Sequence, residues 1–339
     1  MFYTWLTWNL KTYPLIIILI LGFLGNGFIF YIFLRPNFKS SSITKYMRIL
    51  AVTDTILIFV GIVPNVYEGF NRKSLLIRSD AGCILQRFIM FFIGDISVWI
   101  LIAITIDRLV AVVFPIQNTT WKSQKNSIVI LIVVFSLSLI KNFPIFFTLS
   151  VVTNTNGTRF CDTRERFAFY ERKIRPFISL MMYYLIPTII MTICTVVIIL
   201  KMNRVAKKLD VMTNPKRRIS MEINNVNFIR PHYSKSLTQM SIAINILFVL
   251  LLSPSIFIWT IISYWPASIQ SEKISILYDS TNILVFSHHS LNFYLFFLSG
   301  PRFRKEVLQI FGKNYGSILD SKNESIKTAP EQLKEIRLK

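Results

Sequence analysis

The sequence predicts an all-α membrane protein: a seven-transmembrane helix bundle with a short amphipathic eighth helix. Of its 339 residues, 53% are hydrophobic and only 16% are charged, and the mean hydropathy is +0.51. A soluble core of this size cannot bury that much apolar surface. The apolar residues gather in seven runs, each long enough to cross the hydrocarbon of a bilayer: 13–34, 46–67, 83–113, 127–149, 176–200, 237–264 and 276–299.

The charged residues lie where the loops of a membrane protein would be. The net charge is +21, but the basic residues fall between the apolar runs, which favours a membrane surface over nucleic acid as the partner. If the first run enters from outside, the inner segments hold 25 of the 38 Lys and Arg residues. The positive-inside rule then predicts a multi-pass plasma-membrane protein with an extracellular amino terminus and a cytoplasmic carboxyl terminus. Four parts are expected: an extracellular segment 1–12, a transmembrane domain 13–300, an interfacial helix 301–312 and a disordered cytoplasmic tail 313–339.

Polar residues in the first two runs need partners inside the protein. Asn26 stands in an otherwise apolar run, and Asp54 is an ionisable group at membrane depth. The third run is one long helix, because Cys83 and Arg108 are twenty-five residues apart, which spans roughly 37 Å at about 1.5 Å per residue. It ends in Asp107-Arg108, a charged pair that should face protein or water.

The later runs carry further charged and helix-bending residues. Lys141 in the fourth run could snorkel outward or reach Asp95 of the third. Proline interrupts the fifth run at Pro187 and the sixth at Pro254. Beyond the seventh run, Phe303 begins a repeat of apolar residues at i, i+4 and i+8 among basic residues, which is typical of an amphipathic surface helix.

Over about residues 13–311 the chain resembles the rhodopsin-like, or class A, G protein-coupled receptors. The matching positions are Asn26, Asp54, Cys83, Ser97, Asp107, Arg108, Cys161, Pro187, Phe248, Pro254 and Asn292. The departures are Leu109, Phe135, Thr195, Leu252, Phe293 and Phe296. The Asn292-Phe293 pair is similar to the seventh-helix motif of invertebrate neuropeptide receptors of the FMRFamide and myosuppressin type. The resemblance implies a cell-surface receptor, not an enzyme, that transmits neuropeptide binding to a heterotrimeric G protein through Asp107 and Arg108.

The resemblance also implies two structural sites. Cys83 and Cys161 should form an extracellular disulfide, with Cys194 left free inside the fifth helix. Asn26, Asp54, Ser97 and Asn292 should form an internal polar cluster, which could hold a sodium ion at Asp54 and Ser97 or could be a hydrogen-bonded brace without an ion. Other than this sodium ion, no cofactor is expected. The histidines His288 and His289 are interpreted as polar packing in the bundle interior.

The ligand is expected to contact the outer part of the bundle. The candidate residues are Glu68, Arg87, Met90, Tyr183, Trp259, Tyr264 and Asp279. Glu68 and Asp279 suit a cationic peptide, whereas Arg87 and the basic second extracellular loop suit an anionic one, so both remain open. Met90 stands where a receptor for amines would want an acid, and the seventh run has no lysine for a retinal Schiff base.

Glycosylation would report the orientation of the chain. Asn156 is an acceptor in the second extracellular loop, whereas Asn118 and Asn323 match the same pattern on the cytoplasmic side and should stay unmodified. The sixth run has no acid at its start to hold Arg108, so we expect a weak resting lock between the third and sixth helices. An uncoupled or scavenging receptor remains an alternative, because Leu252, Phe293 and Phe296 replace residues associated with switching. A membrane transporter is a further alternative, although the sequence shows neither the internal repeats nor the broken helices common in that class.

Overall fold

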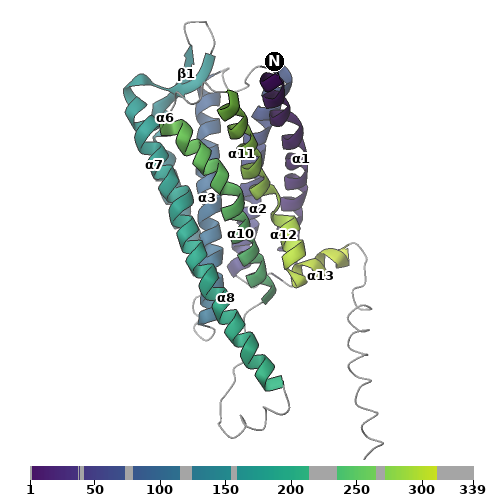
Figure 1. The fold of residues 1–339 in the computed structure, drawn as a ribbon. Coiled ribbons are helices and arrows are strands. Elements are labelled where there is room, and N and C mark those ends of the chain that lie inside the picture. Colours follow the sequence, from purple (N-terminus) through teal and green to yellow (C-terminus); the bar gives the residue numbers. More distant parts are fainter. Residues whose placement is uncertain are drawn as a thin grey trace, which may run out of the picture.

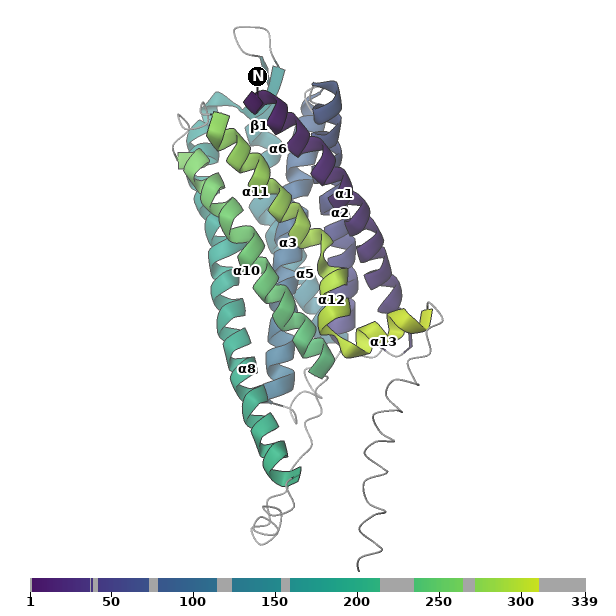
Figure 2. The same cartoon turned by 45° about the vertical axis from the view of Figure 1, so that its right-hand side comes forward.

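Long helices run side by side through the molecule, with a hairpin at one end and a short helix lying across the other (Figure 1, Figure 2). The helices are α1 (Phe2–Ile32), α2 (Ser42–Asn71), α3 (Asp80–Val113), α5 (Gln124–Asn142), α6 (Ile145–Thr148), α7 (Arg175–Ser179), α8 (Ile186–Thr213), α10 (Lys235–Tyr264), α11 (Glu272–Ser290), α12 (Asn292–Ser299) and α13 (Pro301–Ile310). This computed structural model describes residues 2–36, 38, 42–72, 79–114, 124–153, 159–213, 235–264 and 272–310.

Six helices in the described part of the chain are long and apolar enough to cross a membrane. The seventh crossing is made by α11 and α12, which meet at Leu291 in place of the single uninterrupted helix expected over 276–299. Apolar side chains cover the outer surface of α5, where Ile132 is 59% and Ile140 is 70% exposed. A surface of this kind is suited to lipid rather than water, and the predicted class of helical membrane bundle is confirmed.

Several helix ends differ from the ends predicted by hydropathy. Helix α1 begins at Phe2, so most of the segment 1–12 forms its first turns. The fourth crossing stops at Asn142, just before Pro144, because the residue preceding proline is disfavoured in α-helix. The chain then continues through α6 into the strand β1 (Leu149–Thr153). Hydropathy marks where a chain can lie in lipid, and it does not register where backbone hydrogen bonds begin.

The fifth crossing is one continuous helix with two π-helical stretches. It runs through η3 (Tyr170–Ile174), α7, η4 (Leu180–Leu185) and α8. The second stretch lies directly before Pro187, which cannot donate a backbone hydrogen bond to the preceding turn. A π-helical bulge therefore lies beside this proline, and the ring of Tyr183 in η4 approaches Gly94 of α3.

The packed core lies in the middle of the bundle and toward the end marked by Arg108. Phe33, Phe248, Phe296 and Phe303 are among its largest fully buried side chains. Helix α13 joins this core through Phe303, and Glu306 of α13 forms an ion pair with Arg35 at 3.0 Å. We call this end the Arg108 end, and the opposite end, which carries β1 and β2 (Arg159–Thr163), the hairpin end.

Candidate functional site

A disulfide fixes the hairpin to the end of α3. Cys83 at the start of α3 is bonded to Cys161 in β2, with 5.6 Å between their Cα atoms, as predicted. Cys161 pairs across the sheet with Val151, whose backbone N–H donates to the Asp80 carboxylate at 2.7 Å. Cys194 is buried and free, which also agrees with the prediction.

Beneath the hairpin the bundle encloses a cavity of about 720 Å³. Its walls come from α2, α3, α5, β2, the fifth crossing, α10 and α11. Six of the predicted ligand residues line it: Glu68, Arg87, Met90, Tyr183, Trp259 and Asp279. Tyr264 does not, because its hydroxyl donates instead to the backbone carbonyl of Lys173 at 3.1 Å, and the Lys173 ammonium lies 5.2 Å from its ring centroid.

Charges of both signs line this cavity. The cations are Arg72, Arg87, Lys141 and Arg159, and the acids are Glu68, Asp95 and Asp279. Aromatic side chains, among them Phe91, Tyr183 and Trp259, lie between them. The cavity is thus suited to a ligand that presents apolar groups together with charged ones.

An ion pair between α3 and α5 forms part of the cavity wall. The Lys141 ammonium donates to both carboxylate oxygens of Asp95, at 2.7 and 2.8 Å, and the Asn142 side-chain amide donates to Asp95 at 2.6 Å. The Asp95 side chain is 3% exposed and that of Lys141 is 17% exposed. The pairing of Asp95 with Lys141 is therefore confirmed, whereas the contribution of Asn142 could not be anticipated because it depends on the rotation of α5.

A second ion pair lies within the outer part of the fifth crossing. Arg175 donates to Glu171 at 2.7 Å, and Glu171 accepts from the Thr148 hydroxyl at 2.6 Å. The Arg175 guanidinium also lies over the ring of Phe91, 4.3 Å from its centroid. Through Thr148 and Phe91, this pair links the fifth crossing to α6 and α3.

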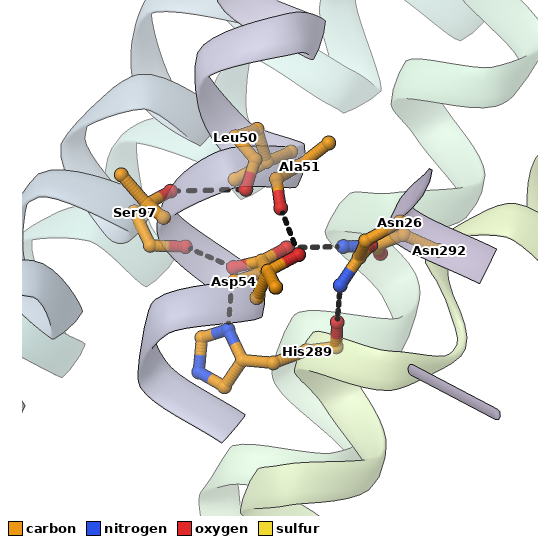
Figure 3. Close-up of polar contacts among 9 residues, drawn as sticks. Asn26, Leu50, Ala51, Asp54, Ser97, His289 and Asn292 are labelled. Atoms are coloured by element: carbon orange, nitrogen blue, oxygen red, sulfur yellow. Dashed lines mark hydrogen bonds and ion pairs between the residues drawn. The ribbon is translucent and has the colours of Figure 1, made fainter. Parts of the chain in front are cut away.

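Near the middle of the bundle, Asp54 is the centre of a buried polar cluster (Figure 3). Its carboxylate accepts from the Ser97 hydroxyl at 2.8 Å and from the Asn292 amide at 2.7 Å. The His289 ring nitrogen Nδ1 lies 2.8 Å from the same carboxylate. Asn26 joins the cluster indirectly, because its amide donates to the backbone carbonyl of His289 at 3.1 Å.

The sodium ion implied by the resemblance does not fit this arrangement. Sodium prefers oxygen ligands, yet the side chain that approaches Asp54 from α11 presents a ring nitrogen. Both carboxylate oxygens already accept hydrogen bonds from protein groups. The contact of His289 with Asp54 was not predicted, because the position of His289 in the seventh run indicates only that it packs in the bundle interior.

At the other end of α3, Arg108 bonds to its neighbour. Its guanidinium donates to the Asp107 carboxylate, as predicted, and Arg108 is only 3% exposed. Helix α10 contains no acidic residue that could bind it. A different contact holds α10: the Asn245 amide donates to the hydroxyls of Thr105 on α3 and Thr195 on α8, both at 2.9 Å.

This second brace was not predicted from the sequence. Asn245 is 5% exposed, and it is an amide in an apolar run, as Asn26 is. The same reasoning that assigned Asn26 a buried partner would have applied to it. The identities of its partners depend on how α3, α8 and α10 pack, which spacing along one helix does not reveal.

Comparison with known proteins agrees with this geometry. The family model of the rhodopsin-family seven-transmembrane receptors matches residues 25–293. The cysteinyl leukotriene receptor 1 of Sus scrofa is 26% identical over 59% of this chain and 58% of that receptor, and the Gq-coupled rhodopsin of Mizuhopecten yessoensis is 26% identical over 86% of this chain and 57% of that protein. An FMRFamide peptide receptor of Caenorhabditis elegans is 23% identical over 89% of this chain and 69% of its own. The chain thus spans less than two thirds of the length of the leukotriene receptor and the rhodopsin.

Proposed function

The chain belongs to the rhodopsin family of seven-transmembrane receptors, and we propose that it is a plasma-membrane receptor that binds a short peptide at its hairpin end and signals to a heterotrimeric G protein at its Arg108 end. The main support for this proposal is that a single helix, α3, contributes both to the cavity at the hairpin end and to the Arg108 end. Helix α3 contributes Arg87 and Met90 to the cavity and Arg108 to the far end of the bundle. A shift of this buried helix would be felt at both sites.

The proposed orientation places the hairpin end outside the cell. The disulfide between Cys83 and Cys161 supports this, because such bonds persist on the oxidising side of a membrane. The basic residues near the Arg108 end, including Arg302, Arg304 and Lys305 of α13, suit the anionic lipids of the inner leaflet. Asn118, Asn156, Asn323 and the tail 313–339 lie outside the described residues.

The cavity lining supports a peptide ligand. A short peptide carries both charges and aromatic or aliphatic side chains, and the walls offer partners for each of these groups. The relatives differ in the ligand that their names give, since one is an FMRFamide peptide receptor and another a cysteinyl leukotriene receptor. An anionic leukotriene is the second candidate, favoured by Arg87 and Arg159 at the cavity.

Signalling would follow from a shift between two arrangements of the helices. A ligand that fits one arrangement better raises its population, and a G protein that binds the same arrangement does likewise, so each strengthens binding of the other. Helix α10 contains Pro254 between the cavity and Asn245, and a proline-containing helix bends there most readily. We expect the Arg108 end of α10 to move outward about this point.

Calcium and cAMP responses of transfected cells test the proposal. Amidated peptides related to FMRFamide and cysteinyl leukotrienes are applied to cells that express the parent receptor, and a peptide response is expected. Asp279→Asn should then lower peptide potency, whereas Tyr264→Phe, a matched control outside the cavity, should leave it unchanged. A response to leukotrienes alone would replace the peptide by the second candidate. Ligand binding without nucleotide exchange on any G protein would identify an uncoupled receptor.

A further inference from the structure

The contact between Asp54 and His289 joins two ionisable groups that are both fully buried. Both side chains are 0% exposed, and 2.8 Å separates Asp54 Oδ1 from His289 Nδ1. The two residues come from facing helices, α2 and α11 (Figure 3). A carboxylate withdrawn from water at this depth is costly unless a cation or a proton neutralises it.

Three side chains touch the Asp54 carboxylate, and only one of them can carry a positive charge. Ser97 and Asn292 donate neutral hydrogen bonds. His289 becomes a cation when both ring nitrogens hold a proton. The other ionisable side chains close by are His288, whose ring centroid is 4.9 Å from that of His289, and Tyr183, which interacts electrostatically with Asp54 and with Asp95. Asp95 is neutralised by Lys141.

We propose that His289 is the built-in counter-cation of Asp54, and that a proton on its imidazole neutralises the cluster where the family resemblance implied a sodium ion. The placement of His289 favours this. The Asn26 amide donates to the backbone carbonyl of His289, and the imidazole Nδ1 of His289 lies against the Asp54 carboxylate. A sodium ion at Asp54 would have to displace the ring or accept a nitrogen ligand. The central cluster is thus a proton-binding site that is closed to sodium.

The charge state of Asp54 and His289 depends on neither the proposed ligand nor the G protein. It concerns the resting receptor, and its test uses purified receptor in detergent without any ligand. Failure of the peptide screen would leave it intact, and failure of the tests below would leave the proposed function intact.

The first measurement is the thermal unfolding midpoint in sodium chloride and in choline chloride at equal ionic strength. The parent receptor should unfold at the same temperature in both salts. His289→Ser, which replaces the imidazole by a small oxygen ligand, should become more stable in sodium than in choline. Asp54→Asn added to that variant should remove the difference. A parent receptor whose midpoint rises in sodium, with the rise lost in Asp54→Asn, would overturn the proposal.

The second measurement observes the proton directly and requires only the parent fold. Receptor carrying ¹⁵N-labelled histidine has three histidines, and the signal of His289 is assigned by its loss in His289→Gln. Both ring nitrogens of His289 should show the shifts of protonated nitrogen at neutral pH, whereas those of His288 serve as the internal comparison in the same interior. A neutral imidazole at His289 would refute the counter-cation, even if sodium had no effect on stability.

Discussion

We expect the two partners of the Asp95–Lys141 ion pair to differ in how much their removal destabilises the receptor. Removing one member of a buried pair typically costs about 3–5 kcal/mol, because the other charge is left uncompensated. Lys141 is 17% exposed and lines the cavity, so in Asp95→Asn its ammonium can turn toward water. That variant should therefore lie at the low end, near 3 kcal/mol. In Lys141→Met the carboxylate of Asp95, 3% exposed, is left with Asn142 alone, and the loss should approach 5 kcal/mol.

The assay is the thermal unfolding midpoint of purified receptor in detergent, with surface expression in cells as a second readout. The double variant Asp95→Asn with Lys141→Met is the control, because it leaves no charge unpaired and should be more stable than either single variant. A double variant as unstable as the two single losses added together would refute the argument from pairing. A larger loss in Asp95→Asn than in Lys141→Met would refute the argument from exposure.

Four further predictions concern coupling, the resting brace and the loop. Arg108→Ala should abolish ligand-stimulated nucleotide exchange while surface expression and ligand binding persist, and undiminished exchange would sink the assigned role. Asn245→Leu should raise basal exchange about sevenfold, since interhelical hydrogen bonds contribute about 0.6 kcal/mol each and two are lost. Basal exchange equal to the parent's would show that the brace does not hold the resting state. Cys83→Ser should lower folded surface expression, and mass spectrometry of the parent should find no free thiol at this position. Glycan mapping should find sugar on Asn156 and none on Asn118, and the reverse result would invert the proposed orientation.

Much of this architecture could be predicted from the sequence, because a bilayer limits how a chain can fold. Backbone groups in lipid must be paired within the chain, so an apolar run of membrane length is a helix whatever its neighbours are. The free-energy cost of burying an unpaired charge also predicts where polar contacts form inside the bundle. Asp54, Asp95 and Lys141 were expected to have partners, and they do. The disulfide followed from a resemblance of the surrounding pattern rather than from spacing.

Features that depend on helix rotation were harder to predict. Adjacent residues on a helix diverge by about 100°, so the sequence could not indicate which of His288 and His289 faces Asp54. The same holds for Tyr264, which follows Trp259 by little more than one turn and yet contacts Lys173 rather than the cavity. The early start of α1 was not predicted for a different reason. Its first turns contain polar residues, which lower the hydropathy so that this part of the helix does not stand out from a loop.

Helix α10 has no acid to bind Arg108, but another contact holds it in place. The sequence correctly indicated that Arg108 would bond to Asp107 and not to the sixth helix. It did not follow that α10 is loosely held, because Asn245 ties this helix to α3 and α8 in the middle of the bundle. Basal activity in this receptor should depend on that amide rather than on a charge pair.

Both strands of the hairpin are anchored to α3. Strand β2 is fixed by the disulfide at Cys161, and β1 is fixed by the bond from Val151 to Asp80. Arg159 and Phe160, which line the cavity, are paired within the sheet with Thr153 and Val152, on either side of the connection 154–158. Insertions and deletions in that connection should accumulate without altering ligand selectivity, and an epitope tag placed there should report surface display of a receptor that still binds.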